Sequence, residues 1–374
     1  MTWSDGHSRL DVTLNGDVTF ADDLSDVLTL SDGGALKIRD WSTLIPHTIE
    51  ITSARGTLTR KYYVGGVARP WSEEARQRLA THITALVRNS GLAAESRVKS
   101  IYEKKGVAGV LDEVDLLGSD YARRRYLTVL LDTARLDAAT VLPVLGRVSE
   151  NMRSDYDRRQ VLEHVAARVT LDQSAASAYA QAVGSMKSDY DRRQSLTALF
   201  NAPGHIADAG ALFTAIDNMR SSYDKRQVLS ELLGRSSLGT DMKQAILRAA
   251  AGIESDYDRS QVLQTYVERS GVEPSVTTQF FTAVNATKSA YERRRILMAV
   301  AKKAPTTREV QQAAFDSIAT MSSDYDRAET LLAFIGTQPL DPSARQAFVA
   351  AAEKIHSSHD QNRVLAALVR AERQ

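Results

Sequence analysis

The sequence contains no cysteine among its 374 residues. This absence excludes disulfide bonds, thiol catalysis, and zinc or iron–sulfur sites held by cysteine. Aromatic residues make up only 6% of the chain, and no apolar run approaches the roughly 20 residues that a membrane-spanning helix needs. The formal net charge is +1, so no strong overall field draws the chain toward nucleic acid or an anionic membrane. These absences leave a folded protein without membrane insertion as the expected class.

Catalytic and nucleotide-binding motifs are also missing from the sequence. It has no G-x-S-x-G nucleophile motif, no P-loop and no G-x-G-x-x-G loop. The N-terminal segment Met1–His7 lacks the basic and apolar segments of a secretory signal. We therefore expect no enzyme activity and no cofactor. The location is expected to be cytoplasmic, or periplasmic or secreted if a signal precedes this sequence.

What the chain has in abundance is a short motif, seen most clearly in Ser154–Leu162. Similar copies begin at later serines, and looser copies start at Ser119 and Ser357. Successive motif serines are separated by about 34 residues along the whole series. A fixed period of this length indicates an array of structural repeats.

Each repeat is predicted to hold two helices. With the motif serine taken as position 0, position 8 is leucine in all eight copies, and positions 11 and 12 are mostly large and apolar. This spacing places the three positions on one face of an α-helix. A second helix then runs to the next serine, with an apolar residue two positions before it in most copies. Neighbouring helix pairs must stack to bury these faces, so we predict a HEAT-like or tetratricopeptide-like α-α superhelix.

The N-terminal segment, positions 1–71, has a different pattern. Hydrophobic residues alternate with polar ones on both sides of Asn15-Gly16, a pair that favours a tight hairpin turn. Further alternating runs are separated by glycines. We therefore predict a small antiparallel β domain over residues 1–71, as a meander or small sandwich.

Between the β domain and the repeats the spacing is helical. Ser72 can cap a first helix, and shorter helices are expected around residues 97–104 and 107–116. Residues 72–118 are predicted to cover the open end of the stack, because the terminal unit of a solenoid must shield its neighbour. Residues 119–374 are predicted to form the solenoid of about eight repeats.

The repeated polar residues have a structural interpretation. A serine at position 0 and an acid at position 3 match a capping box, in which each side chain bonds to a backbone N–H of the other residue. The predicted caps are Ser119, Ser154, Ser188, Ser221, Ser255, Ser289, Ser323 and Ser357, with Asp157, Asp191, Asp224, Asp258 and Asp326. They define where each repeat begins.

Positions 2 and 4 are tyrosine and arginine or lysine in most copies. We expect each position-4 arginine to bond to carboxylates at positions 1 or 3 of a neighbouring repeat, forming a ladder. The tyrosines are expected to pack flat between adjacent first helices. The same residues could line a binding surface as well, although we expect a functional surface more at positions that vary between repeats, such as 5, 6, 9 and 10. The candidates are Tyr156, Arg158, Tyr190, Arg192, Tyr223, Lys225, Tyr257 and Arg259.

Two further interpretations of the repeats are a metal site and a nucleic-acid-binding surface. The Asp-x-Asp pairs could hold a divalent cation, and His356 and His359 could be two ligands, but further ligands are not evident. The arginine rows could follow a phosphate backbone, yet nearly every arginine pair is accompanied by aspartates. These patterns favour no metal and no nucleic acid.

Three N-terminal segments carry a resemblance to a known family. Gly16–Val27, Ser31–Gly34 and Arg60–Gly66 are similar to the C-terminal region of bacterial β-lactam-sensor-like membrane metallopeptidases and of their stand-alone relatives. In these proteins a small β unit precedes helical repeats that begin Ser-Asp-Tyr. The present chain lacks their H-E-x-x-H motif and membrane helices, so no proteolytic residue is carried over. The resemblance implies a bacterial sensory or envelope module in an extracytoplasmic location.

Together these patterns predict a non-enzymatic scaffold that binds a protein or peptide along its superhelix. Two alternatives stay open at this point. One is a nucleic-acid-binding HEAT-like protein or an enzyme that uses the arginine rows. The other is a structural solenoid that assembles with copies of itself.

Overall fold

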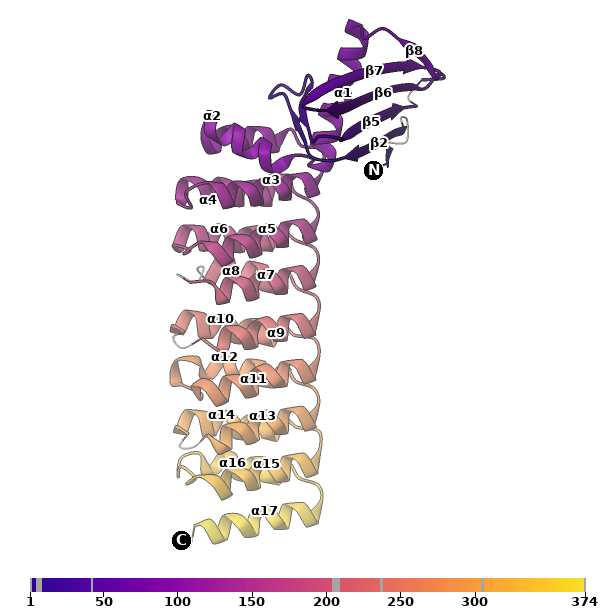
Figure 1. Ribbon diagram of the computed structural model, residues 1–374. Coiled ribbons are helices and arrows are strands. Elements are labelled where there is room, and N and C mark those ends of the chain that lie inside the picture. Colours follow the sequence, from indigo (N-terminus) through magenta and orange to yellow (C-terminus); the bar gives the residue numbers. More distant parts are fainter. Residues whose placement is uncertain are drawn as a thin grey trace. The chain divides into compact units, whose positions relative to one another are not determined.

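The computed structural model describes residues 2–4, 9–41, 43–203, 209–235, 238–303 and 306–372. Contacts divide the chain into two compact units, residues 1–169 and residues 170–374. The first unit holds an antiparallel sheet followed by five helices, and the second holds helices that follow one another in succession (Figure 1). The predicted fold class, a helical solenoid with a small N-terminal β domain, is confirmed.

The β domain is built on a six-stranded antiparallel sheet with the strand order β1-β2-β5-β6-β7-β8, while β3 and β4 pair in a separate ribbon. The strands are β1 (Thr2–Ser4), β2 (Arg9–Asn15), β3 (Val18–Phe20), β4 (Val27–Leu30), β5 (Ala35–Asp40), β6 (His47–Ala54), β7 (Thr57–Val64) and β8 (Val67–Arg69). Alternate residues of β6 are buried, including Ile49 and Ile51. They share a core with Leu79 and Ile83 of the first helix, so one face of the sheet is covered.

The predicted hairpin at Asn15-Gly16 is wrong. Gly16 does have a positive φ of 91°, but β2 pairs with β5, with Asn15 opposite Ala35. The strand after the turn, β3, pairs with β4 instead. Alternation of polar and apolar residues reports which face of a strand is buried, and it carries no information about the neighbouring strand.

Two helices connect the sheet to the repeats. The first, α1 (Glu73–Ser90), begins at Ser72, whose side chain accepts a hydrogen bond from the backbone N–H of Ala75. The second, α2 (Ala94–Asp115), contains both of the shorter helices that the sequence predicts. It is interrupted at Gly106, whose φ of 66° is favourable only for a residue without a side chain. The predicted break is therefore a kink within one element.

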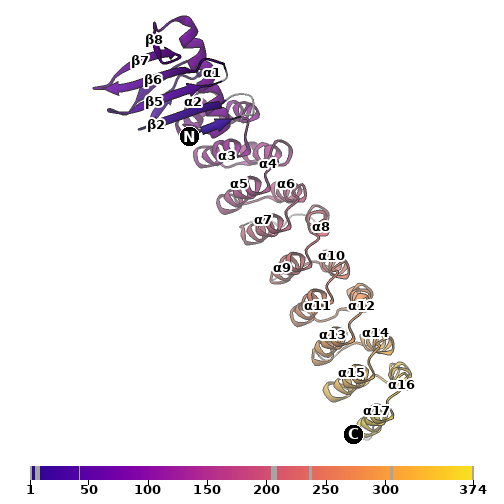
Figure 2. The same ribbon diagram turned by 90° about the vertical axis from the view of Figure 1, so that its right-hand side faces the viewer.

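The repeats consist of paired helices. The first helices are α3 (Asp120–Thr133), α5 (Asp155–Arg168), α7 (Asp189–Asn201), α9 (Ser222–Leu233), α11 (Asp256–Ser270), α13 (Ala290–Lys302), α15 (Asp324–Thr337) and α17 (Ser358–Ala371). The second helices are α4 (Ala138–Asn151), α6 (Gln173–Gly184), α8 (Ala209–Asp217), α10 (Thr240–Ala251), α12 (Thr277–Ala286), α14 (Arg308–Ala319) and α16 (Arg345–Glu353), with a 3-10 turn η1 (Pro274–Val276) before α12. In the second unit the first helices form one row and the second helices another (Figure 2).

The position-8 leucines anchor the first helices. Seven of them are fully buried, with 0% of the side chain exposed, whereas Leu365 of α17 is only partly buried. The residue two positions before each motif serine is buried as well, for example Met186 and Ile253. Burying one such side chain contributes about 1.5–3 kcal/mol, so both positions stabilise the packing of the helices. The buried leucines are Leu127, Leu162, Leu196, Leu229, Leu263, Leu297 and Leu331.

Candidate functional site

The motif serines are the N-caps of the first helices. In all eight copies the serine Oγ accepts a hydrogen bond from the backbone N–H of position 3, at 3.1 to 3.3 Å. These bonds occupy one of the N–H groups that a helix start leaves without an intrahelical acceptor. Each repeat therefore starts its first helix at the same place in the motif.

The serine's own backbone N–H is bonded across the repeats. Oδ2 of Asp189, at position 1, accepts from the backbone N–H groups of Arg220 and Ser221, each at 2.7 Å. The same relation joins Asp120 to Ser154, Asp256 to Ser289 and Asp324 to Ser357. The capping box inferred from the sequence assigned this donor to the acid at position 3. In the structure this backbone N–H donates instead to the side chain at position 1 of the preceding repeat.

The electrostatics of this contact favour the charged carboxylate. Burial alone would raise the pKa of the Asp120 carboxyl. Two backbone N–H donors from the next repeat, together with Arg123, outweigh burial and hold that pKa below its ordinary value. A carboxylate at a helix N-terminus is also stabilised by the helix dipole. The aspartate at position 1 therefore acts as a charged link between successive helix starts.

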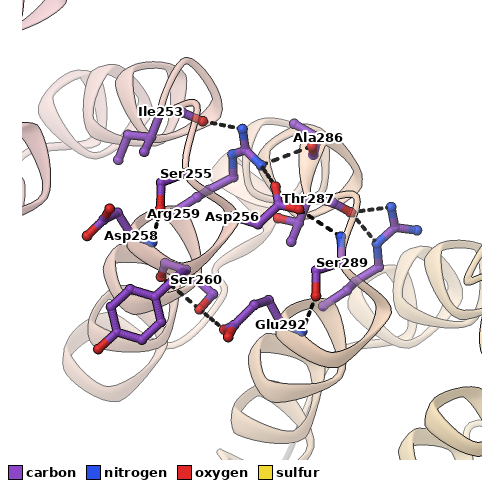
Figure 3. A network of polar contacts seen from close by, with 12 residues as sticks. Ile253, Ser255, Asp256, Asp258, Arg259, Ser260, Ala286, Thr287, Ser289 and Glu292 are labelled. Carbon is purple, nitrogen blue, oxygen red and sulfur yellow. Dashed lines mark hydrogen bonds and ion pairs between the residues drawn. The ribbon is translucent and has the colours of Figure 1, made fainter. Parts of the chain in front are cut away.

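The position-4 arginines that follow Arg123 are buried and form several hydrogen bonds. Arg259 is 5% exposed, and its Nη1 donates to Oδ1 of Asp256 at 2.6 Å and to the carbonyl of Ala286 at 3.0 Å (Figure 3). Its Nη2 donates to the carbonyl of Ile253. The guanidinium thus joins the start of its own helix to the ends of the second helices on either side. Arg192 and Arg327 make the equivalent bonds.

The ladder predicted from position 4 is therefore wrong. The carboxylate partner of Arg158, Arg192 and Arg259 lies three residues earlier in the same helix. Residues three apart share one face of a helix, so this pairing needs no neighbouring repeat. Lys225 has no aspartate at position 1, and its Nζ instead donates to the carbonyl of Asp217 at 3.5 Å.

A ladder does exist, one position farther along the helix. Nε of Arg193, at position 5, lies 2.7 Å from Oδ1 of Asp224 in the next repeat, and Arg226 bonds to Asp258 at the same distance. Arg124 and Asp157 in the first unit, and Arg294 and Asp326 in the second, form the same pair. The position-3 acids are thus used twice, as the residue whose backbone N–H bonds to the capping serine and as the carboxylate of the ladder.

The tyrosines of the motif form an exposed row. Each ring is 45–56% exposed, although the sequence analysis expected these rings to pack flat between the helices. The guanidinium carbon of Arg193 lies 5.3 Å from the Tyr190 ring centroid and 5.9 Å from that of Tyr223. These distances are typical of cation–π contacts. The tyrosine row consists of Tyr190, Tyr223, Tyr257, Tyr291 and Tyr325 in the second unit, and Tyr121 and Tyr156 are exposed in the same way in the first unit.

The arginine between Tyr257 and Tyr291 is replaced. Position 5 of this repeat is Ser260, and its hydroxyl bonds to Oε2 of Glu292, the longer acid at position 3 of the next repeat (Figure 3). Arg295 lies 3.1 Å from the same carboxylate oxygen. A groove of about 430 Å³ lies nearby between α11 and α13. It is lined by Gln264, Val267, Glu268, Arg295, Met298, Ala299, Lys302 and Lys303.

A polar cluster in the β domain was missed by the sequence analysis. Nδ1 of His47 lies 2.6 Å from the Tyr62 hydroxyl, and Nε2 of His82 lies 3.4 Å from Oδ2 of Asp40. Burial lowers the pKa of both histidines and raises the pKa of the Tyr62 hydroxyl. The residues come from β5, β6, β7 and α1, so no local motif brings them together. Such shifts occur in functional sites and in structural networks alike.

The described part of the chain offers no group of three or more histidine or acidic side chains that could hold a metal ion. Nδ1 of His356 lies 3.7 Å from Oδ1 of Asp324. Among the described helices none is both long and apolar enough to cross a membrane.

Comparisons with known proteins return no match to this chain, whether with protein-family models, curated proteins or solved structures. The geometry of the tyrosine row is therefore the main guide to function.

Proposed function

We propose that this chain is a non-enzymatic scaffold that binds a protein or peptide along the tyrosine row. The observation that carries the proposal is the repeated exposure of a large aromatic ring at position 2. Of the fourteen large hydrophobic side chains exposed in the described residues, seven are position-2 tyrosines, and five of these form the row in the second unit. Tyrosine and arginine are enriched in the energetically important centres of protein interfaces. A row of both is a suitable surface for a polypeptide partner.

The other residues of the motif have structural roles. Serine caps the helix, the position-1 aspartate links to the next repeat, and the position-4 arginine is buried. The tyrosine side chain takes no part in the helix caps or in the bonds of the buried arginines. These interactions therefore do not explain why tyrosine recurs at position 2. A ligand that contacts the row would explain it.

The charge arrangement favours protein over nucleic acid. Binding to a phosphate backbone gains free energy when lysine and arginine replace condensed counterions. Here Arg193 and Arg226 are already paired with Asp224 and Asp258. A phosphate would have to compete with these carboxylates and would be repelled by them.

Stacking also prepares the rings for binding. The guanidinium carbons of Arg193 and Arg226 lie 5.9 and 5.2 Å from the centroid of the Tyr223 ring. A ring held in this way loses little side-chain freedom when a partner binds, which favours affinity. The resemblance of the N-terminal segments supports a place for this scaffold in a bacterial sensory or envelope system.

Selection of peptides from a random display library on the full chain tests the proposal. The test variant combines Tyr190→Ala, Tyr223→Ala and Tyr257→Ala, and the control is Val369→Ala, which removes an exposed apolar side chain outside the row. Selected peptides should bind the triple variant at least about tenfold more weakly and the control unchanged. Equal affinity for a triple variant that keeps its helical circular dichroism would overturn the proposal.

A further inference from the structure

We infer that the segment bound by the tyrosine row is a polyproline II helix, with one turn of three residues against each tyrosine. This inference rests on the proposed function and names the class of its ligand. It concerns the uninterrupted part of the row in the second unit, Tyr190, Tyr223 and Tyr257, with Arg193 and Arg226 between them.

The spacing of the tyrosines carries the inference. The guanidinium carbon of Arg226 lies 5.2 Å from the Tyr223 ring and 5.9 Å from the Tyr257 ring, so the two rings are at most about 11 Å apart. Packed helices bring their axes to about 8–10 Å, and equivalent atoms of successive repeats in a regular array are spaced by about this distance. A polyproline II helix rises about 3.1 Å per residue and turns every three residues, so equivalent side chains recur about every 9.3 Å. This period falls within the interval set by the row.

Other regular backbones fit the row less well. In a β-strand equivalent side chains recur about every 6.8 Å, which is shorter than the interval between tyrosines. An α-helix returns to the same face after seven residues, about 10.5 Å, which does match the spacing. A bound helix, however, lays an apolar stripe into a hydrophobic groove. The tyrosine row alternates rings with ion pairs, so its apolar surface is interrupted between successive tyrosines.

The polarity of the surface also suits a proline-rich chain. Such a chain has backbone carbonyls without internal partners, and its prolines have no N–H donors. It therefore needs hydrogen-bond donors from its receptor and no acceptors. The tyrosine hydroxyls are donors, while the carboxylates Asp224 and Asp258 are already bonded to arginines. Aromatic-lined surfaces that bind polyproline II segments use this combination of flat rings and hydroxyl donors.

The test measures binding of fluorescently labelled synthetic peptides to the full chain by anisotropy. The probes, each about nine residues long, are an oligoproline, an alternating Thr-Val peptide, an alanine-based helical peptide and a Gly-Ser peptide. The oligoproline should bind more tightly than the other three. Shortening it to about six residues should weaken binding, because one tyrosine of the three then has no turn against it.

Variants connect this binding to the row. Tyr223→Phe removes one hydroxyl donor and keeps the ring, so oligoproline affinity should fall about three- to tenfold. Tyr223→Ala should reduce it further, and Val369→Ala should leave it unchanged. Oligoproline binding that is insensitive to both Tyr223 variants would overturn the inference.

The remaining outcomes separate this inference from the proposed function. If the Thr-Val or helical peptide binds best, and binding is lost in the triple tyrosine variant, the polyproline inference is wrong and the scaffold proposal stands. If no probe binds and the display library also yields no peptide sensitive to that variant, both are wrong.

Discussion

Asp189 bonds to the N-cap residue of the first helix in the next repeat: its Oδ2 lies 2.7 Å from the backbone nitrogen of Ser221. The same carboxylate is paired through Oδ1 with Arg192, three residues along its own helix, at 3.0 Å. One side chain therefore holds the position-4 arginine and the following helix start together. In a repeat array stability depends on such contacts between neighbours, so this pair is a sensitive place to test the array.

We expect Asp189→Ala to lower the free energy of unfolding by about 2–4 kcal/mol, because it removes the acceptor of the Ser221 backbone N–H and leaves a buried guanidinium without its carboxylate. Urea denaturation followed by circular dichroism measures this loss. A loss below about 0.5 kcal/mol, the range of ordinary surface substitutions, would contradict the role assigned to the aspartate.

The chain provides a matched control for that variant. In the following repeat position 1 is Ser222, whose hydroxyl accepts from the backbone N–H of Ser255 at 3.2 Å, and position 4 is Lys225. The double variant Asp189→Ser with Arg192→Lys copies this pair. It should be more stable than the sum of the two single substitutions predicts, by about 1–2 kcal/mol. Simple additivity would show that the two positions are independent.

Leu229 and Leu365 occupy position 8 in different surroundings. Leu229 is fully buried in α9, and Leu365 is only partly buried in α17. Leu229→Ala should therefore lower the free energy of unfolding by about 2–5 kcal/mol. Leu365→Ala should cost clearly less. Equal losses at the two positions would mean that burial of position 8 does not anchor the first helices.

Two buried tyrosines differ in the bonding of their hydroxyls. The Tyr179 hydroxyl donates to the carbonyl of Ser195 at 2.9 Å, whereas that of Tyr266 has no hydrogen-bond partner among the described residues. Tyr179→Phe should cost about 1 kcal/mol. Tyr266→Phe should be neutral or slightly stabilising, because it removes an unsatisfied polar atom from the core. Thermal melting of both variants distinguishes them, and a clear loss in Tyr266→Phe would contradict the assignment.

The β domain should lose stability in mild acid. Burial lowers the pKa of His47 and His82 below the unfolded value of about 6.5. As the pH falls below that value, the unfolded chain binds protons before the folded one does, so the free energy of unfolding decreases. The three tryptophans, Trp3, Trp41 and Trp71, all precede the first helix, so tryptophan fluorescence reports on this domain. The denaturant concentration at the midpoint should decrease as the pH is lowered from about 7 to about 5.

His82→Gln isolates the contribution of one histidine to this effect. The variant keeps a polar side chain beside Asp40 but cannot take up a proton in this range. Its denaturation midpoint should change less with pH than that of the unmodified chain. Identical pH profiles would show that His82 does not contribute.

The eight serines determined the repeat boundaries, because capping is a local interaction between a side chain and the backbone three residues away. The burial of the position-8 leucines followed in the same way from helical periodicity. Strand pairing, in contrast, does not depend on residues that are close in the sequence. The choice of β5 over β3 as the partner of β2 depends on contacts between distant segments, and the turn at Gly16 did not reveal it.

The candidate surface also combines features that the sequence predicts with features that depend on the tertiary structure. The sequence by itself determined that tyrosine, arginine and aspartate recur at fixed positions of a helix, because these residues repeat with the period of the fold. Only the tertiary structure decided which of them meet. The offset between neighbouring first helices places Arg193 beside Asp224 and between Tyr190 and Tyr223, while Arg192 turns inward to Asp189. Adjacent arginines point in different directions on a helix, so one becomes part of the core and the other part of the exposed row.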